Sequence, residues 1–288
     1  MTITTASSHK NRTMKSCSLD CAVTAYATSR LSFDEVNLLR KQSDNLPGAL
    51  GNSVLRHSDE QTLAALATVR DALNQFDSCP EDFRDWGVVC SSRYLGRSAF
   101  AQALTKFAID GPWNVSVQVV PNRSLHSPAS MVGLALGCHG PCVGVGGGLD
   151  GETDAWITAT SLLDQQSLPG MWLVFSGWEP DEHVDLEGNA LSESRCTALV
   201  MALQPMSVPV HKARLQIQYD SLSPAAVEVP AKTTAFRLFE RFLSEESDQK
   251  PIAAMLGGGL RADLSWAPVI EASIPLSTPI SVPQKKAA

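Results

Sequence analysis

The chain is predicted to adopt an α/β fold in which helices cover a mixed sheet. Short, almost continuously apolar runs typical of buried strands alternate along it with longer segments of helical periodicity. Residues 140–156 combine both patterns, because a strand-like run at 142–145 passes through a cluster of glycines into a helical run at 153–166. Hydrophobic residues make up 44% of the 288 residues, which suffices for the core of one globular domain with extensions.

The first long helix is expected at residues 58–76, where Ser58 and Gln61 have the spacing of a capping box. Its apolar residues recur at intervals of three and four, so they share one face. They are Leu63, Leu66, Val69, Leu73 and Phe76. A buried strand that ends in a polar loop is predicted next, at residues 86–92.

Two further helices are delimited by residues that favour helix ends. The helical run at 98–109 stops before Gly111, which a proline follows. The next helix is bracketed by Ser127 as N-cap, Pro128 at the first helical position and Gly137 beyond its end. Both helices lie between predicted strands, as an α/β arrangement requires.

The last part of the chain is expected to hold three strands and one helix. The strands are predicted at residues 171–177, 197–203 and 213–219. The helix is predicted at residues 233–244, and its apolar side chains are Phe236, Phe239, Phe242 and Leu243. Three consecutive glycines and a proline-punctuated tail follow, and we expect the last dozen residues to be disordered.

The turn that leads into the helix at 153–166 is an elbow of the kind at which many enzymes carry a nucleophile. A strand that turns sharply into a helix passes through conformations that a Cβ atom would obstruct, which explains the glycines. These are Gly146, Gly147, Gly148 and Gly151. The nucleophile position falls on a glycine or on Leu149, and neither side chain attacks a carbonyl or donates a proton. The sequence therefore predicts a catalytic scaffold without its catalytic residue.

Three of these glycines also match the G-x-G-x-x-G pattern of dinucleotide-binding loops, namely Gly146, Gly148 and Gly151. In that interpretation the chain is a dinucleotide-binding oxidoreductase. Against it, Asp150 and Glu152 place two negative charges at the helix N-terminus, where a pyrophosphate needs bare N–H groups. A lone glycine fingerprint is a weak signal, and this function is kept as an alternative.

The segment before the elbow, residues 119–137, reads VVPNRSLHSPASMVGLALG and is followed by Gly140 and Pro141. It resembles the N-terminal half of the β-ketoacyl synthases of the thiolase superfamily. In that family a P-x-S stretch leads into a helix of small residues, then a G-x-x-GP turn, a strand, and the elbow that bears the active-site cysteine. The order and spacing agree, and the resemblance covers about residues 15–220.

The family's V-S-T-A-C-A-x-G elbow falls on residues 145–152, so Leu149 takes the place of the cysteine. Chain-length factors, the partners of ketosynthases in aromatic polyketide and aryl polyene pathways, have a similar glycine-rich elbow and also lack the cysteine. The sequence is more similar to them than to active ketosynthases. Leu149 stands where several chain-length factors carry a glutamine, so the resemblance does not extend to a role of that amide in malonyl decarboxylation.

The resemblance implies a thiolase-like layered fold that is a single half rather than the usual duplicated pair. We expect a disordered leader at residues 1–15, a ketosynthase-like domain at 16–220, and an extension at 221–288 with one helix and a proline-rich tail. The second half of a complete ketosynthase supplies two active-site histidines, which we expect this chain to lack. A lone half exposes an apolar layer, which the aromatic helix of the extension and a partner subunit are expected to cover.

The function implied is that of a non-catalytic subunit, similar to a chain-length factor, which pairs with a full-length β-ketoacyl synthase. It would shape the acyl tunnel in polyketide or fatty-acid-type chain elongation, while an acyl carrier protein docks indirectly or through the partner. Candidate tunnel residues are Met131, Leu134 and Leu149, for which core packing is an equally good interpretation. No cofactor is expected, and a homodimeric acyl-binding pseudoenzyme is a further alternative.

Composition argues against several classes of function. The net charge of −7, without a dense basic cluster, disfavours nucleic-acid binding. No apolar run approaches the length of a membrane span. Seven cysteines, an odd number, in a chain without an apolar signal region favour a reduced cytoplasmic protein. Arg93, Arg97 and Lys106 are a candidate docking patch, although a solvated helix end explains them better.

A zinc site is a chemical alternative that the cysteine spacing leaves open. Cys138, His139 and Cys142 would begin it, and Cys17 and Cys21 would complete it. Under the resemblance, however, Cys138 and His139 lie in a surface turn and Cys142 enters a buried strand, where cysteine commonly acts as a small hydrophobic residue. We therefore expect no metal.

Nucleophilic and acid–base catalysis have weak support in the sequence. A hydrolase would use one of four serines together with His126, but no G-x-S-x-G pattern surrounds Ser91, Ser92, Ser124 or Ser127. Cys90 and Cys196 lie in apolar strand runs, where burial raises the pKa of a thiol and favours its inert form. Three carboxylates follow the strand at 171–177 and are explained by a solvated loop: Glu179, Asp181 and Glu182.

Overall fold

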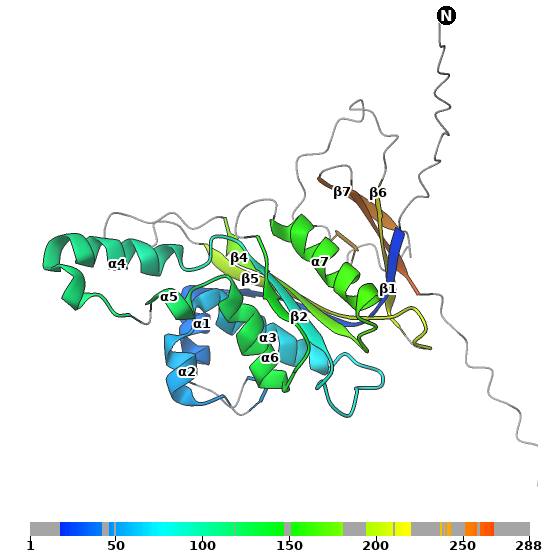
Figure 1. Ribbon diagram of the computed structural model, residues 1–288, viewed down its shortest axis with the longest axis horizontal. Helices are drawn as coiled ribbons and strands as arrows, with labels where there is room; N and C mark the ends of the chain where they lie inside the picture. The colour runs from blue at the N-terminus through cyan, green and yellow to red at the C-terminus, as the bar shows by residue number, and fades with distance from the viewer. Residues whose placement is uncertain are drawn as a thin grey trace, which may run out of the picture.

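The computed structural model describes residues 18–41, 46–48, 50–117, 119–146, 151–180, 194–209, 211–219, 237, 239, 241–242, 251–257 and 260–267. Its centre is an eight-stranded mixed sheet with helices on both faces, which confirms the predicted α/β class (Figure 1). Within these residues, no helix is both long enough and apolar enough to cross a membrane.

The strands lie across the sheet in the order β3-β2-β4-β5-β1-β6-β8-β7. Their bounds are β1 Ser18–Leu31, β2 Gly87–Ser92, β3 Cys142–Gly144, β4 Met171–Glu179, β5 Arg195–Gln204, β6 Ala213–Tyr219, β7 Ile252–Gly257 and β8 Leu260–Trp266. Strand β2 pairs in parallel with β3 and β4. The pairings from β4 to β7 are antiparallel, and β1 pairs with β6 through its first half and with β5 through most of the remainder.

The helices are α1 Phe33–Leu39, α2 Asn52–His57, α3 Glu60–Leu73, α4 Arg97–Asp110, α5 Val119–Asn122, α6 His126–Leu136 and α7 Gly151–Gln165, with a 3₁₀ turn η2 at Pro112–Asn114. Helices α3, α4, α6 and α7 lie where the sequence predicts helices. Helix α4 ends at Gly111 and α6 ends at Gly137, whose φ of +68° is the left-handed conformation expected of a glycine cap.

Two predicted N-caps are wrong. Helix α3 begins after Asp59, whose carboxylate accepts a hydrogen bond from the Gln61 N–H. Ser58 instead ends α2, and its hydroxyl donates to the Val54 carbonyl within that helix. Helix α6 begins after Leu125, which makes no side-chain cap bond, so Ser127 lies inside the first turn. In both cases the preceding turn sets the start of the helix, and the predicted cap is displaced by one or two residues.

The core has two parts, one on each face of the sheet. Along β4, Leu173 and Phe175 pack with α7, whereas Trp172 and Val174 pack with α3 and α6. Because both faces are covered, β4 and β5 are buried almost throughout, as their continuous apolar sequences predict. On the α3 side the rings of Phe76, Phe83 and Trp86 surround Trp172.

The segment after residue 220 contributes more to the sheet than the sequence predicts. Strand β8 pairs with the whole of β6, and β7 pairs with β8, so the sheet continues into the extension. Phe239 and Phe242 are fully buried in the same core part as α7. Phe236 and Leu243, predicted on the same helix, lie outside the described residues.

Candidate functional site

The elbow lies at the end of β3, an edge strand beside β2. Beyond β3, the Val145 N–H still donates to the Cys90 carbonyl at 2.9 Å. The chain then passes through Gly146, whose φ of +76° suits glycine, and α7 begins at Gly151. Residues 147–150, which include Leu149, lie outside the described residues. The predicted sequence of strand, glycine turn and helix is therefore confirmed on both sides of the turn.

Close backbone packing explains the glycines that the structure describes around the elbow, Gly144, Gly146 and Gly151. A Cβ atom on Gly144 would clash with the Leu125 carbonyl, and one on Gly146 would clash with the Cα atom of Gly151. A Cβ atom on Gly151 would in turn lie 3.0 Å from the Ser91 hydroxyl oxygen. The glycines thus allow β3, the segment before α6 and the start of α7 to come together, which is a structural requirement rather than a chemical one.

The Gly144→Ala substitution is expected to lower the free energy of unfolding by about 3 kcal/mol, because the added methyl group meets backbone atoms that cannot rotate away. Chemical denaturation measures this change. Gly177→Ala is the matched control, since its Cβ atom would lie at an ordinary 3.4 Å from the nearest atom of Arg93. We expect a change below about 1 kcal/mol for the control. Equal losses in the two variants would contradict the steric explanation.

A small pocket, partly open to solvent, lies beside the N-terminus of α7 at the carboxyl ends of β2 and β4. This end of parallel strands is where α/β proteins commonly bind ligands. The polar residues of its lining are Arg93, Glu152, Ser176, Glu179 and Thr197. Glu179 also forms an ion pair with Arg30 at 3.3 Å. Among the residues that the structure describes, the lining contains neither a thiol nor an imidazole.

A chain of buried polar side chains connects this pocket to the start of α3. The Ser92 and Ser176 hydroxyl oxygens lie 2.7 Å apart, and the Ser176 hydroxyl donates to the Gln61 side-chain oxygen at 3.1 Å. The Gln61 side-chain amide in turn donates to the Arg93 carbonyl at 3.0 Å. Sequence reasoning missed this network, since its members come from three segments and each is unremarkable in its local sequence.

The cysteines predicted as core residues are buried. Cys90 and Cys196 lie in the core part beneath α3, and burial raises the pKa of the Cys90 thiol well above its usual range. Burial, followed by the nearby Cys142, raises the pKa of Cys138 to about 12. Cys142 itself packs against Gly133 of α6. The thiols of Cys90 and Cys138 are therefore held in the neutral form, which is a poor nucleophile.

The candidate zinc ligands do not form a described metal site. Cys138 and Cys142 are neighbours, but Cys21 is buried on β1, in the other part of the core, and Cys17 lies outside the described residues. Over the parts of the chain that the structure describes, no three His, Cys, Asp or Glu side chains are placed to hold a metal ion.

The remaining candidate residues are dispersed. Ser91 and Ser92 are buried, while Ser124 lies in the turn before α6 and His126 is the first residue of that helix. The three basic residues of the candidate docking patch are separated too. Arg93 donates to the Trp178 carbonyl, Arg97 lies over the Tyr94 ring, and Lys106 is exposed about two and a half turns further along α4.

The candidate tunnel residues lie on α6, the helix that packs against the elbow strand β3. Met131 is half-buried, and the Leu134 side chain is 65% exposed. Neither lines the pocket beside α7. Their tunnel role, like that of Leu149, remains a prediction.

Comparisons with known proteins find the fold but no close relative. No protein-family model and no curated protein matches the chain. A structure of a ketosynthase (ApeO) in complex with its chain length factor (ApeC) from Xenorhabdus doucetiae matches with a TM-score of 0.53 and 13% identity, covering 86% of this chain and 99% of the matched chain. The ishigamide ketosynthase/chain length factor gives a TM-score of 0.48 and 13% identity, covering 70% of this chain and 68% of the matched chain.

A β-ketoacyl synthase from Burkholderia phymatum STM815 also matches, with a TM-score of 0.48 and 12% identity over 74% of this chain and 66% of that one. At these identities the likeness concerns the fold, and of these three matches the one to the ApeO–ApeC structure, with a TM-score above 0.5, carries the argument. The protein therefore has the thiolase-like α/β fold of the ketosynthase and chain length factor structures.

Proposed function

We propose that the chain is a non-catalytic subunit, similar to a chain-length factor, which pairs with an active β-ketoacyl synthase and shapes its acyl tunnel. The observation that carries this proposal is the elbow. Its backbone follows the strand–turn–helix course at which a ketosynthase-like fold would carry its nucleophile, yet residues 145–152 include no cysteine. The match to a structure containing a ketosynthase and its chain length factor supports the same assignment.

A partner surface is supported by the segment that projects from the domain between β2 and α6. We call residues 97–117 and 119–122, which form α4, η2 and α5, the arm (Figure 1). Six of the eleven large hydrophobic side chains that are exposed among the described residues belong to it. They are Leu104, Phe107, Ile109, Trp113, Val117 and Val120. An exposed apolar group of this kind marks an interaction surface.

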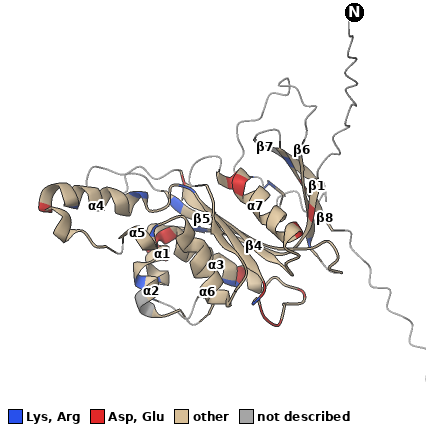
Figure 2. Cartoon of the chain, viewed as in Figure 1, with Lys and Arg blue, Asp and Glu red and all other residues tan. Residues whose placement is uncertain are grey.

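The described residues provide little packing that would stabilise the arm within this chain. Helix α4 has no buried residue, and it carries only three charged residues, so it is drawn mostly in the colour of uncharged residues in Figure 2. A helix of its length is marginally stable in water without tertiary contacts. A ketosynthase subunit that covers the arm would supply those contacts. We therefore propose that the arm binds the ketosynthase.

The tunnel is proposed to run past α6. This helix packs closely on the elbow strand, because Gly133 leaves room only for the Cys142 sulfur, and its next residue, Leu134, is exposed. Side chains of α6 therefore extend from the elbow to the surface. In an assembly with a ketosynthase, Met131 and Leu134 are in position to limit the growing acyl chain at the subunit boundary.

Replacing Met131 by Trp is expected to shorten the products of the reconstituted pathway, and Met131→Ala is expected to lengthen them, because the side-chain volume at α6 changes in opposite directions. The same pair of substitutions at Leu149 is expected to act likewise. Mass spectrometry of the released products measures chain length. Leu38→Trp, at an exposed position on α1, is the control. An unchanged distribution in all the Met131 and Leu149 variants would contradict the tunnel role.

Pairing itself is tested by co-expression of the chain with a ketosynthase and size-exclusion chromatography of the product. A stable complex that elongates acyl chains, while the isolated chain forms no covalent acyl adduct, supports the proposal. A monodisperse homodimer that does not bind the ketosynthase would instead favour the function of an acyl-binding pseudoenzyme. A covalent acyl-enzyme formed by the chain alone would exclude a non-catalytic role.

The dinucleotide alternative is disfavoured by the place of the glycine loop in the sheet. In a dinucleotide-binding fold the loop follows a central strand, where the strand order reverses. Here it follows β3, an edge strand of three residues. Thermal stabilisation of the protein by NAD(P) would support the dinucleotide-binding function.

A further inference from the structure

Strand β7 lies at one edge of the sheet that the described residues form, because the strand order ends in β6-β8-β7. Its sequence, IAAMLG, contains no charged residue and no proline. Proteins commonly protect an edge strand with such residues or cover it, because its outer N–H and C=O groups otherwise pair with any available strand. The outer edge of β7 is therefore suited to accept a further strand.

The two faces of the sheet differ near this edge. Ile252 of β7 and Leu264 of β8 are buried in the core part that contains α7. On the opposite face Ala253 is exposed, and Arg261 and Asp263 of β8 form an ion pair at 2.8 Å. Because successive side chains of a strand point to opposite faces, a strand that continues this sheet needs apolar residues at alternate positions.

Residues 274–283 have this alternation in their sequence, IPLSTPISVP, and lie outside the described residues. Every odd position is a serine or a proline. The even positions are Ile274, Leu276, Thr278, Ile280 and Val282. The composition of this segment predicts disorder for the segment alone, whereas its alternation predicts a strand beside an open edge.

The positions of the prolines fit a strand that pairs on one side only. Successive residues of a strand direct their N–H groups to opposite neighbours. Proline has no N–H and is confined within sheets to edge strands, where its nitrogen faces away from the paired side. Pro275, Pro279 and Pro283 all occupy odd positions, so every even position can donate a hydrogen bond to the same neighbour.

The chirality of L residues fixes the direction of such a strand, because the side-chain face and the N–H side together determine it. In β2 the Val88 N–H donates to the Pro141 carbonyl beside β3, so Val89, which faces the α7 core, directs its N–H away from β3. A strand that runs opposite to β2 directs its core-facing N–H groups back toward β3. Beyond β7 that is the side on which β7 lies, so the added strand must run opposite to β2.

Strand β7 has this same direction. Strand β4 is parallel to β2, and each strand from β5 to β7 reverses the direction of its neighbour, so β7 runs opposite to β2. The added strand must therefore be parallel to β7. Strand β8 ends at Trp266 beside the start of β7, since Leu264 faces Ile252, so a strand that leaves from this end runs parallel to β7.

The length of the connection selects this edge of the sheet. The seven residues 267–273 span at most about 25 Å when fully extended. A strand beyond β7 lies two strand spacings, about 10 Å, from β8. A strand beyond β3, at the opposite edge, would lie about 34 Å from β8 and is out of reach.

We propose that residues 274–282 add to the outer edge of β7 of the same chain as a parallel strand. Their even side chains extend the core part that contains α7, in which Leu260 and Trp266 of β8 are only partly buried. Their prolines occupy the outer side of the new strand, which then offers few N–H groups to any other chain. The segment thus closes the sheet, and this role does not depend on the proposed function.

Proline substitutions at two adjacent positions test the pairing. Thr278→Pro removes an N–H that the added strand directs at β7, whereas Ser277→Pro removes one that it directs at solvent. Hydrogen exchange measured by NMR is read at the amides of Ala253 and Met255, which alternate with the core-facing Ile252 and so point to the outer edge of β7. We expect these amides to be protected in the wild-type chain. Thr278→Pro should lower their protection at least about tenfold, and Ser277→Pro should change it less than about twofold.

Three results would overturn the proposal. The first is an absence of protection at both amides in the wild-type chain. The second is an equal loss of protection in the two proline variants, because the pairing predicts a difference between even and odd positions. The third is wild-type protection in Thr278→Pro.

Truncation gives an independent test. A chain that ends at residue 273 should lose the protection of both amides and form larger species in size-exclusion chromatography, because the apolar edge is then open. A chain that ends at residue 283 keeps the strand and should behave as the wild type does. A wild-type dimer that dissociates on truncation at residue 273 would place the segment on a second copy and contradict pairing within one chain.

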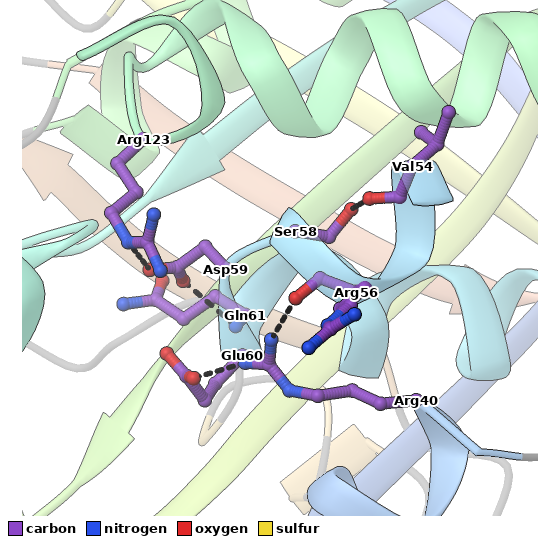
Figure 3. Close-up of polar contacts among 8 residues, drawn as sticks. All are labelled: Arg40, Val54, Arg56, Ser58, Asp59, Glu60, Gln61 and Arg123. Carbon is purple, nitrogen blue, oxygen red and sulfur yellow. Dashed lines mark hydrogen bonds and ion pairs between the residues drawn. The ribbon is translucent and has the colours of Figure 1, made fainter. Parts of the chain in front are cut away.

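Asp59→Ala is the control for the association of the truncated chain. Figure 3 shows the Asp59 carboxylate accepting the hydrogen bond from the Gln61 N–H, at 2.9 Å, which caps α3. Helix α3 packs on the sheet face opposite α7, so the loss of this cap weakens the fold without opening the edge of β7. This variant should elute as the wild type does. Association of Asp59→Ala to the same extent as the truncated chain would contradict the explanation by an open edge.

Discussion

Replacing Phe242 by Ala is expected to lower the free energy of unfolding by about 3–5 kcal/mol, the range for truncating a buried aromatic side chain. Phe242 is fully buried, and its ring is stacked on Trp266 of β8 with centroids 4.2 Å apart. The loss should therefore loosen the β7–β8 hairpin and the core beneath α7 together. Urea denaturation followed by tryptophan fluorescence measures the effect.

Phe107→Ala is the matched control for this prediction, because the same atoms are removed from a side chain that is 52% exposed on α4. We expect it to change the stability of the isolated chain by less than about 0.5 kcal/mol. A Phe242→Ala protein as stable as the Phe107→Ala protein would show that the segment after residue 220 is not part of the folding unit.

Replacing Trp113 by Ala is expected to weaken binding to the ketosynthase by roughly 30-fold or more, which corresponds to the loss of about 2 kcal/mol at an interface hot spot. Trp113 is 97% exposed in the isolated chain and lies at the turn between α4 and α5. Its removal should leave the stability of the isolated chain unchanged. Isothermal titration calorimetry or surface plasmon resonance with the ketosynthase measures the affinity.

Leu38→Ala provides the comparison, since Leu38 is an exposed hydrophobic residue on α1, outside the arm. Its affinity for the ketosynthase should remain at the wild-type value. Wild-type affinity in Trp113→Ala, together with a loss in Leu38→Ala, would move the interface away from the arm.

The sequence predicts the buried strands well because their signal is local. Strands β4, β5 and β6 begin within two residues of their predicted starts, since uninterrupted apolar runs are needed where both faces of a sheet are covered. The elbow can be predicted from the sequence equally well, because a glycine cluster between a strand and a helix has one simple steric explanation. The fold class followed from these two signals.

Strands β1, β7 and β8 were not predicted, because tertiary pairing rather than local sequence defines them. Strand β1 mixes polar and small residues, and its ladder partners lie far away in the sequence, as Ala22 faces Gln204. The Asp59 cap was missed because Ser58 and Asp59 are both good capping residues and only the packing of α2 decides between them. The network through Gln61 depends on contacts that no local pattern records.

The long first strand has a consequence for the order in which the molecule is made. Strand β1, Ser18–Leu31, is translated before both of its neighbours in the sheet, and these neighbours, β5 and β6, follow it by well over a hundred residues. Until then its backbone groups have no native ladder partners, and the nascent chain presents an open strand to its surroundings. The native pairings of this strand therefore form only after segments far along the chain have been made, which lengthens the time for which the strand is open to non-native pairing.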